Sequence, residues 1–321
     1  MKITLNGQHK EFNNIANVQD LVTQVCQHTN HIITEINGDI VKLEQRVSTL
    51  IKEGDTIELL NFVGGGQEGL KIADKTFQSR FFLGTGKFQN KTDLTESITA
   101  SGCELVTVAV RRIDIKRHEE NILEYIPQNI TLMTNTSGAR NAKEAIRIAR
   151  IAKESGYGNW VKIEVINDSK YLLPDNHETI KATETLVKEG FVILPYVTPD
   201  IYVARELVKV GAAAVMPLGS LIGSNQGIQA KKMISILIQE IDIPIIVDAG
   251  IGAPSHAAEA MEMGAEAVLV NTAVATAQYP AQLAKAFGMA IEAGRLGYLS
   301  KLPETKNIAN ASSPLTGFLY K

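Results

Sequence analysis

The chain has 321 residues, of which 45% are hydrophobic and 21% charged, and its formal net charge is −3. This balance excludes a basic surface for a nucleic acid or an anionic membrane, and the two cysteines lack the spacing of a zinc site or a disulfide framework. No apolar run is long enough for a membrane span or a signal peptide, so we expect a cytoplasmic globular protein. We expect it to contain neither a metal nor an organic cofactor.

Residues 1–63 have the pattern of a small α+β unit. The first strand, in MKITLNG, ends in an Asn-Gly pair, which is typical of a tight hairpin. Further strands are predicted at 31–38 and 55–63. Apolar residues at helical spacing predict a helix over 18–28; they are Val18, Leu21, Val22, Val25 and Cys26. The order strand, strand, helix, strand, strand is that of a ubiquitin-like β-grasp domain, whose last strand runs into the sequence FVGGG.

From about residue 80, short buried-strand patterns alternate with helical patterns. The strand patterns begin at residues 81, 104, 131, 160, 191, 213, 244 and 267. Strands that are apolar on both faces and separated by helices indicate a parallel sheet. Eight such units predict a (β/α)8 TIM barrel, with an open doubly wound sheet as the alternative. We therefore divide the chain into a domain of residues 1–66, a linker of 67–80 and a barrel of 81–321.

The strand WVKIEVI carries two charged residues in a pattern that packing alone does not explain. Strand alternation places Lys162 and Glu164 on one face and the apolar residues on the other, so the charged pair is expected to point into the barrel. Burial lowers the pKa of a lysine and favours the free amine that attacks carbonyl groups, although Glu164 partly opposes this shift. We predict a catalytic pair; a structural ion pair, or a register that exposes both side chains, is the alternative.

Asp248 ends the otherwise apolar strand of IIVDAGIG. A cap of the following turn is one interpretation, but two charged residues predicted to face the same interior favour a general acid or base. Glycine-rich segments follow the sixth, seventh and eighth strands, where barrels usually bind phosphate. These segments are 219–227, 249–252 and 271–273. Together the residues predict a Schiff-base enzyme that acts on a phosphorylated carbonyl compound.

With these residues the chain resembles thiazole synthase of thiamine biosynthesis, fused behind a sulfur-carrier protein. The likeness rests on VKIEVI, LPYVTPD, AAAVMPLGSLIGSNQG, IIVDAGIG and EAVLVNTAVA, which lie between about 70 and 310. Residues 1–66 resemble the ubiquitin-like carrier. The resemblance implies condensation of 1-deoxy-D-xylulose 5-phosphate, dehydroglycine (2-iminoacetate) and carrier thiocarboxylate sulfur into thiazole phosphate carboxylate.

The resemblance also implies roles for individual residues and for partners. Lys162 would form the imine, with Glu164 and Asp248 as acid/base carboxylates. The implied sugar-phosphate contacts are Gly223, Ala249, Gly250, Asn271 and Thr272. Expected partners are an enzyme that produces dehydroglycine, an enzyme that adenylates the carrier and transfers sulfur to it, and further copies of this chain in a homo-oligomer.

The glycines at the end of the carrier-like segment raise a chemical difficulty. A thiocarboxylate is made on a free carboxyl terminus, but Gly65 and Gly66 are followed by Gln67. Three alternatives are open: the chain is cleaved after the glycines, a separate carrier delivers the sulfur, or the front domain only docks. For the barrel, the alternatives are an aldolase-type Schiff-base lyase and a non-catalytic phosphate-binding protein.

Overall fold

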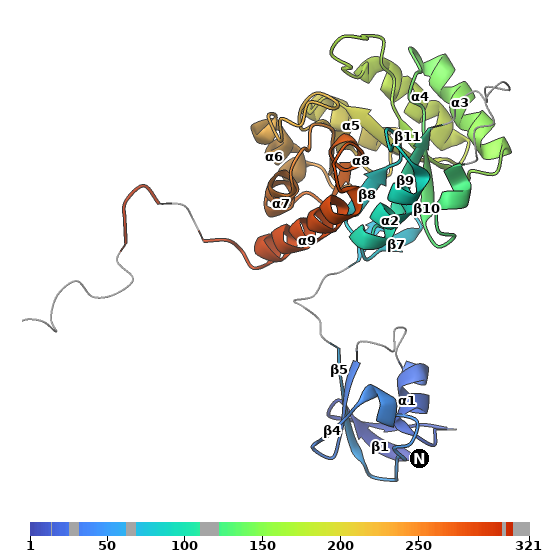
Figure 1. Cartoon of the computed structure of the whole chain (residues 1–321), viewed down its shortest axis with the longest axis vertical. Helices are drawn as coiled ribbons and strands as arrows, with labels where there is room; N and C mark the ends of the chain where they lie inside the picture. The colour runs from blue at the N-terminus through green and yellow to red at the C-terminus, as the bar shows by residue number, and fades with distance from the viewer. Residues whose placement is uncertain (14, 26–31, 62–68, 110–121, 304–305, 311–321) are drawn as a thin grey trace, which may run out of the picture. The chain divides into compact units, whose positions relative to one another are not determined.

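The structure, a computed structural model, describes residues 1–13, 15–25, 32–61, 69–109, 122–303 and 306–310. The chain divides into two compact units, Met1–Gln67 and Glu68–Lys321 (Figure 1). The predicted carrier tail, Gly65 and Gly66, lies outside the described residues, as does Cys26. Within the described ranges, no helix has the length and apolarity needed to cross a membrane, and no cluster of His, Cys, Asp and Glu suits a metal ion.

The first unit is a five-stranded mixed sheet with one helix, α1 (Val18–Val25), packed on it. The strands are β1 (Lys2–Leu5), β2 (Gln8–Glu11), β3 (Ile32–Ile36), β4 (Asp39–Val41) and β5 (Thr56–Asn61). Their order is β2-β1-β5-β3-β4, with β1 and β5 parallel at the centre. Helix α1 buries Val18, Leu21 and Val22 against the sheet, whereas Val25 is exposed. This arrangement confirms the predicted β-grasp fold.

Two Asn-Gly pairs shape the hairpins of this unit. Asn6 and Gly7 have φ values of 48° and 71°, and Asn37 and Gly38 have 53° and 94°. Positive φ at both central residues is the geometry of a type I′ turn, which matches the twist of the flanking strands. The first hairpin was predicted from its dipeptide. The second joins β3 to β4, a strand that the sequence analysis missed although the same dipeptide marks it.

The second unit contains eight parallel strands that close into a barrel. They are β8 (Phe81–Gly84), β9 (Leu105–Ala109), β10 (Thr131–Asn135), β11 (Trp160–Ile163), β12 (Val192–Val197), β13 (Met216–Pro217), β14 (Ile246–Asp248) and β15 (Ala267–Val270). Strand β8 pairs with both β9 and β15. Backbone hydrogen bonds join β13 to β14, from Ile246 N to Val215 O (2.9 Å) and from Gly219 N to Asp248 O (2.8 Å). The closure confirms the barrel and excludes the open sheet.

Helices surround the barrel strands (Figure 1). They are α2 (Lys91–Ser101), α3 (Ala142–Glu154), α4 (Asn176–Lys188), α5 (Ile201–Lys209), α6 (Lys231–Glu240), α7 (Pro254–Glu262), α8 (Thr272–Ala275) and α9 (Pro280–Leu299). Asn90, Asn141, Asp175 and Asp200 begin four of them by accepting hydrogen bonds from first-turn amides. Val161, Ile163 and Val165 pack in one cluster with three buried alanines of α3, so the alternate side chains of the same segment point into the barrel. This is the register that the sequence predicted.

The predicted linker, 67–80, requires a correction. Within it, β6 (Leu70–Ile72) and β7 (Lys75–Phe77) form an antiparallel hairpin. Its buried side chains, Leu70, Ile72 and Phe77, belong to the same apolar cluster as the barrel interior. The ring of Phe77 packs edge-on against Phe82 (5.8 Å between centroids) and Trp160 (5.6 Å). These contacts make the hairpin part of the barrel unit, because each strand buries apolar area that a free connection would expose.

Candidate active site

A cavity of about 990 Å³ opens at the carboxyl ends of the barrel strands. It is lined by residues of β9, β10, β11, β14 and β15 and by loops that follow the barrel strands, including those after β8 and β13. All the barrel residues predicted to form the site line this one cavity: Lys162, Glu164, Gly223, Asp248, Ala249, Gly250, Asn271 and Thr272. The parallel barrel explains the convergence, since every strand ends at the same rim.

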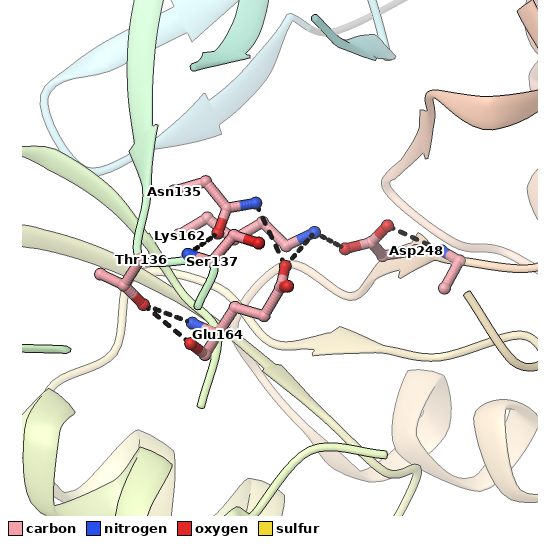
Figure 2. Close-up of polar contacts among 7 residues, drawn as sticks. Asn135, Thr136, Ser137, Lys162, Glu164 and Asp248 are labelled. Carbon is pink, nitrogen blue, oxygen red and sulfur yellow. Dashed lines mark hydrogen bonds and ion pairs between the residues drawn. The ribbon is translucent and has the colours of Figure 1, made fainter. Parts of the chain in front are cut away.

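Lys162 lies at the centre of the charged groups. It is 5% exposed, and its Nζ is ion-paired with Asp248 Oδ2 and lies 3.7 Å from Glu164 Oε2 (Figure 2). Asp248 and Glu164 are also buried, at 4% and 7% exposed. The buried amine thus has a buried carboxyl group on two sides, and ion pairs of this kind persist in a protein interior only when both partners are present.

The pair of carboxylates changes the expected titration of the lysine. Burial lowers the pKa of Lys162, but the negative charges of Asp248 and Glu164 together outweigh burial, so its pKa is raised above the ordinary 10.5. This corrects the sequence expectation, which allowed burial to dominate because Asp248 was not known to touch the amine. Lys162 is therefore an ammonium ion in this arrangement. It can act as a nucleophile only when a neighbouring group takes its proton.

Glu164 is held by the strand next to it. Asn135 Nδ2 donates to Glu164 Oε2 (3.1 Å), and the Ser137 amide donates to Asn135 Oδ1 (2.8 Å), which fixes the orientation of the Asn135 side chain (Figure 2). Thr136 Oγ1 donates to the carbonyl oxygen of Glu164 (3.0 Å) and accepts from its amide (2.8 Å). Asn135 was not among the predicted site residues. Its place at the end of β10, beside the strand that carries Lys162, is the signal that identifies it.

Asp248 uses both of its carboxylate oxygens. Oδ1 accepts a hydrogen bond from the Ala249 amide (2.7 Å), and Oδ2 contacts Lys162. The Ala249 bond caps the backbone that follows, as the alternative interpretation expected, while Oδ2 stays directed at the lysine. The hydrogen bond from the Ala249 amide to Oδ1 thus orients the carboxylate so that Oδ2 faces the amine of Lys162. A proton acceptor in direct contact with a nucleophile is the geometry that general base catalysis requires.

The loop after β14 carries unusual backbone geometry. Ala249 and Gly250 have φ values of 63° and 76°, in the left-handed region. A Cβ on Gly250 would overlap the hydroxyl of Ser220, so only glycine fits there. The Gly227 amide donates to Gly250 O (2.8 Å), and the Gly252 amide donates to His256 Nδ1 (3.2 Å). Left-handed geometry at a non-glycine residue such as Ala249 is strained and persists only where neighbouring contacts enforce it.

Lys87 is a cavity residue that the sequence analysis missed. It follows β8, and its Nζ donates to Thr272 Oγ1 (3.2 Å), beyond the end of β15. A Cβ on Gly223 would lie 3.3 Å from the same Nζ, so Lys87, Thr272 and Gly223 surround one point of the rim. The phosphate site was predicted only from the loops after the sixth, seventh and eighth strands. In a closed barrel the first strand adjoins the last, and this brings Lys87, in the segment FFLGTGKF, to the predicted phosphate site.

Asn271 links two loops of the same rim. With its amide oriented so that nitrogen faces acceptors, Nδ2 donates to the carbonyl oxygens of Gly86 (2.7 Å) and Gly84 (3.0 Å). A Cβ on Gly84 would collide with the Asn271 side chain. Asn271 therefore fixes the loop that carries Lys87, in addition to lining the cavity.

Comparison with known proteins identifies the two units separately. Residues 71–314 match the family described as thiazole biosynthesis protein ThiG, and residues 3–66 match the ThiS family. The thiazole synthase of Pelotomaculum thermopropionicum is 62% identical over 253 residues, which are 79% of this chain and 99% of that protein. The thiazole synthase of Acetivibrio thermocellus is 61% identical over 250 residues, or 78% of this chain and 98% of that protein.

A solved structure supports the same assignment. The crystal structure of the Amycolatopsis orientalis BexX/CysO complex contains a chain that is 34% identical to this one, with a TM-score of 0.69. The match covers 76% of this chain and 100% of that chain. The chain therefore belongs to the thiazole synthase family of thiamine biosynthesis, as an enzyme whose barrel is preceded by a ThiS-family domain.

Proposed function

We propose that the barrel condenses 1-deoxy-D-xylulose 5-phosphate, dehydroglycine and thiocarboxylate sulfur into thiazole phosphate carboxylate, through an imine on Lys162. The observation that carries the proposal is the buried amine of Lys162 in contact with Asp248, inside a cavity large enough for several small reactants. A primary amine with an adjacent proton acceptor is the group that forms imines with carbonyl substrates.

The rim formed by Lys87, Thr272 and Gly223 receives the phosphate group. Lys87 supplies a cation, Thr272 a hydroxyl, and Gly223 a backbone with no side chain in the way. The left-handed turn at Ala249 and Gly250 lines the same cavity. A phosphate anchored here leaves the sugar chain free to extend towards Lys162, which is a positioning effect.

Replacing Lys87 by methionine is expected to raise KM for the sugar phosphate by about tenfold or more and to leave kcat within about twofold, because it removes a charge that binds substrate and transition state alike. Lys87→Arg is the matched control, since it keeps the cation at the same left-handed position. Steady-state kinetics at varied sugar phosphate measure the effect. A fall in kcat at unchanged KM would contradict an anchoring role.

The change Gly250→Ala is expected to weaken sugar-phosphate binding roughly tenfold, because the new methyl group collides with Ser220 and displaces the loop. Gly102→Ala is the control: Gly102 has a φ of 66° and ends α2, and no atom lies within 4 Å of a Cβ built there. Both variants bear the left-handed strain of about 1–2 kcal/mol. Thermal unfolding and KM for the sugar phosphate are compared between the two variants. Equal KM values would show that the loop takes no part in sugar-phosphate binding.

Imine formation begins with a proton transfer. Asp248 takes one proton from the Lys162 ammonium, and the amine attacks the ketone carbon of the sugar phosphate. Asp248 returns that proton to the carbonyl oxygen, which leaves as water with a second hydrogen from the nitrogen. The ammonium thus becomes an iminium with one N–H, and the positive charge is retained. Asp248 is the first acceptor because it contacts Nζ directly, whereas Glu164 is 3.7 Å away.

The iminium acidifies the neighbouring C–H bond, so that a carboxylate can move the carbonyl function along the sugar chain. Glu164 is suited to this step because Asn135 and Thr136 hold it beside Lys162. The sulfur nucleophile then adds, and ring closure with dehydroglycine releases water. Two further enzymes are needed, one to supply dehydroglycine and one to activate the carrier.

The proposal is tested by incubating the purified full chain with the three reactants, the sulfur being supplied as the thiocarboxylate of a separately prepared front domain ending at Gly66. We expect thiazole phosphate carboxylate, detected by mass spectrometry, and none when the thiocarboxylate is omitted. Cleavage of the sugar phosphate without any need for sulfur would instead identify the aldolase-type lyase.

We further propose that the front domain carries sulfur only after the chain is cut behind Gly66. Adenylation needs a carboxylate, and an internal Gly66–Gln67 amide offers none. The ThiS-family match ends at residue 66, where the carrier's free end is expected. Intact mass of the protein from its native cells tests this: two fragments are expected, and an undivided chain of 34.9 kDa in active cells would assign sulfur delivery to a separate carrier.

A further inference from the structure

Tyr196 is a buried aromatic residue next to the reactive lysine. It lies on β12, the strand that pairs with the strand of Lys162, two residues beyond Leu194, which is opposite the lysine. Its ring centroid is 5.1 Å from Lys162 Nζ, and the residue is fully buried. The described residues that line the cavity do not include Tyr196, so its ring supports the lysine without forming part of the substrate space.

This contact differs from the other cation–ring contacts of the described residues. Those of Lys75, Lys91, Lys153, Lys170 and Arg295 each have at least one partner that is not buried. Lys162 and Tyr196 are both buried, at 5% and 0% exposed. The attraction between a cation and an aromatic face is strongest where water is excluded from both groups.

Imine formation reduces the number of N–H groups on the Lys162 nitrogen, and this loss explains how the ring can contribute. The Lys162 ammonium has three N–H groups with which to contact Asp248 and Glu164, but an iminium nitrogen has one. At most one carboxylate can therefore keep a direct N–H contact after the substrate is attached. A ring face needs no N–H to attract positive charge, so its contact survives the loss of two hydrogens as water.

We propose that Tyr196 is a positioning residue whose ring face holds the Lys162 nitrogen in place and stabilises its positive charge as the ammonium becomes an iminium. This inference rests on the imine chemistry proposed above. The proposed role belongs to the aromatic ring of Tyr196 and not to its hydroxyl group. The phenol oxygen is buried and has no hydrogen-bond partner among the described residues. Burial, with the negative charges of Asp248 and Glu164, raises the pKa of Tyr196 above its ordinary value, which keeps the phenol protonated and unsuited to act as a base.

Two substitutions separate the ring from the hydroxyl. Tyr196→Phe keeps the ring, and Tyr196→Leu removes it. Phe82→Leu is the matched control, because Phe82 is also a fully buried aromatic residue of the barrel interior but packs on Phe77 instead of Lys162. The full chain of each variant is mixed with 1-deoxy-D-xylulose 5-phosphate and reduced with cyanoborohydride, and the fraction labelled at Lys162 is measured by mass spectrometry, with thermal unfolding in parallel.

We expect Tyr196→Leu to lower the labelling rate by about tenfold or more, and Tyr196→Phe and Phe82→Leu to stay within about twofold of the parent. Tyr196→Phe is also expected to unfold at the same or a higher temperature, because it removes an unpaired buried hydroxyl. Equal losses in Tyr196→Phe and Tyr196→Leu would overturn the role of the ring, as would unchanged labelling in Tyr196→Leu. Failure of the parent to label at Lys162 would instead overturn the imine itself.

Discussion

Lys162→Arg is expected to abolish thiazole formation, lowering kcat by at least about a thousandfold, while leaving a folded protein. Arginine keeps a positive charge between Asp248 and Glu164, so the buried carboxylates retain a partner. Its guanidinium does not release a proton at any working pH, so it offers no amine to attack the substrate. The loss therefore reports on nucleophilic chemistry and not on the ion pair.

The assay for this variant is product formation with all three reactants, with thermal unfolding alongside. Lys75→Arg is the matched control: Lys75 also lies over an aromatic ring, that of Trp160, and donates to Thr131 at the opposite end of β10 from the cavity. We expect it to keep full activity. A Lys162→Arg enzyme that retained a tenth of the parent activity would exclude an obligatory imine at this position.

Asp248→Asn is expected to slow turnover and, at the same time, to make Lys162 easier to deprotonate. Turnover should fall by roughly 10²–10⁴-fold, because the direct proton acceptor is gone. The pKa of Lys162, however, should fall, since the lowering effect of burial is then opposed by Glu164 alone. A larger fraction of the lysine is then a neutral amine at a given pH. Reductive labelling of Lys162 should therefore begin at lower pH than in the parent.

The raised pKa of Lys162 also makes the free energy of unfolding depend on pH. A raised lysine pKa stabilises the folded chain below the ordinary value of 10.5, and this stabilisation is lost as the pH rises through the higher folded value. The parent should therefore keep this contribution at neutral pH, and Asp248→Asn should lose much of it. The labelling rate and the unfolding temperature are measured across pH, with Asp200→Asn, a helix-cap change at which asparagine also caps, as the control. A labelling profile shifted to higher pH would contradict the electrostatic reasoning.

The sequence was sufficient for those features that depend on local periodicity. Alternation in WVKIEVI predicted that Lys162 and Glu164 point inwards. The structure has that register because the alternating apolar residues, Val161, Ile163 and Val165, pack on the helices. Eight strand patterns predicted the barrel, and the barrel brings every rim segment to one cavity. These predictions succeed because each depends on a repeating pattern several residues long.

Features set by contacts between distant segments were beyond such patterns. The ion pair of Lys162 with Asp248 determines the direction of the lysine pKa, and it joins residues on β11 and β14 whose side-chain contact no periodicity specifies. Lys87 reaches Thr272, at the proposed phosphate site, only because β8 closes against β15. The hairpin of β6 and β7 has three residues in each strand, which is too short for alternation to separate it from a linker.

An imine between Lys162 and the sugar phosphate is the central claim, and borohydride reduction tests it most directly. The parent chain is incubated with 1-deoxy-D-xylulose 5-phosphate alone, reduced, digested and mapped by mass spectrometry. We expect one adduct on the peptide that contains Lys162, and none in Lys162→Arg. Its mass increment is the substrate mass less one water plus two hydrogens, which is a net loss of one oxygen. No adduct in the parent, or an adduct of equal yield on another lysine and in Lys162→Arg, would contradict it.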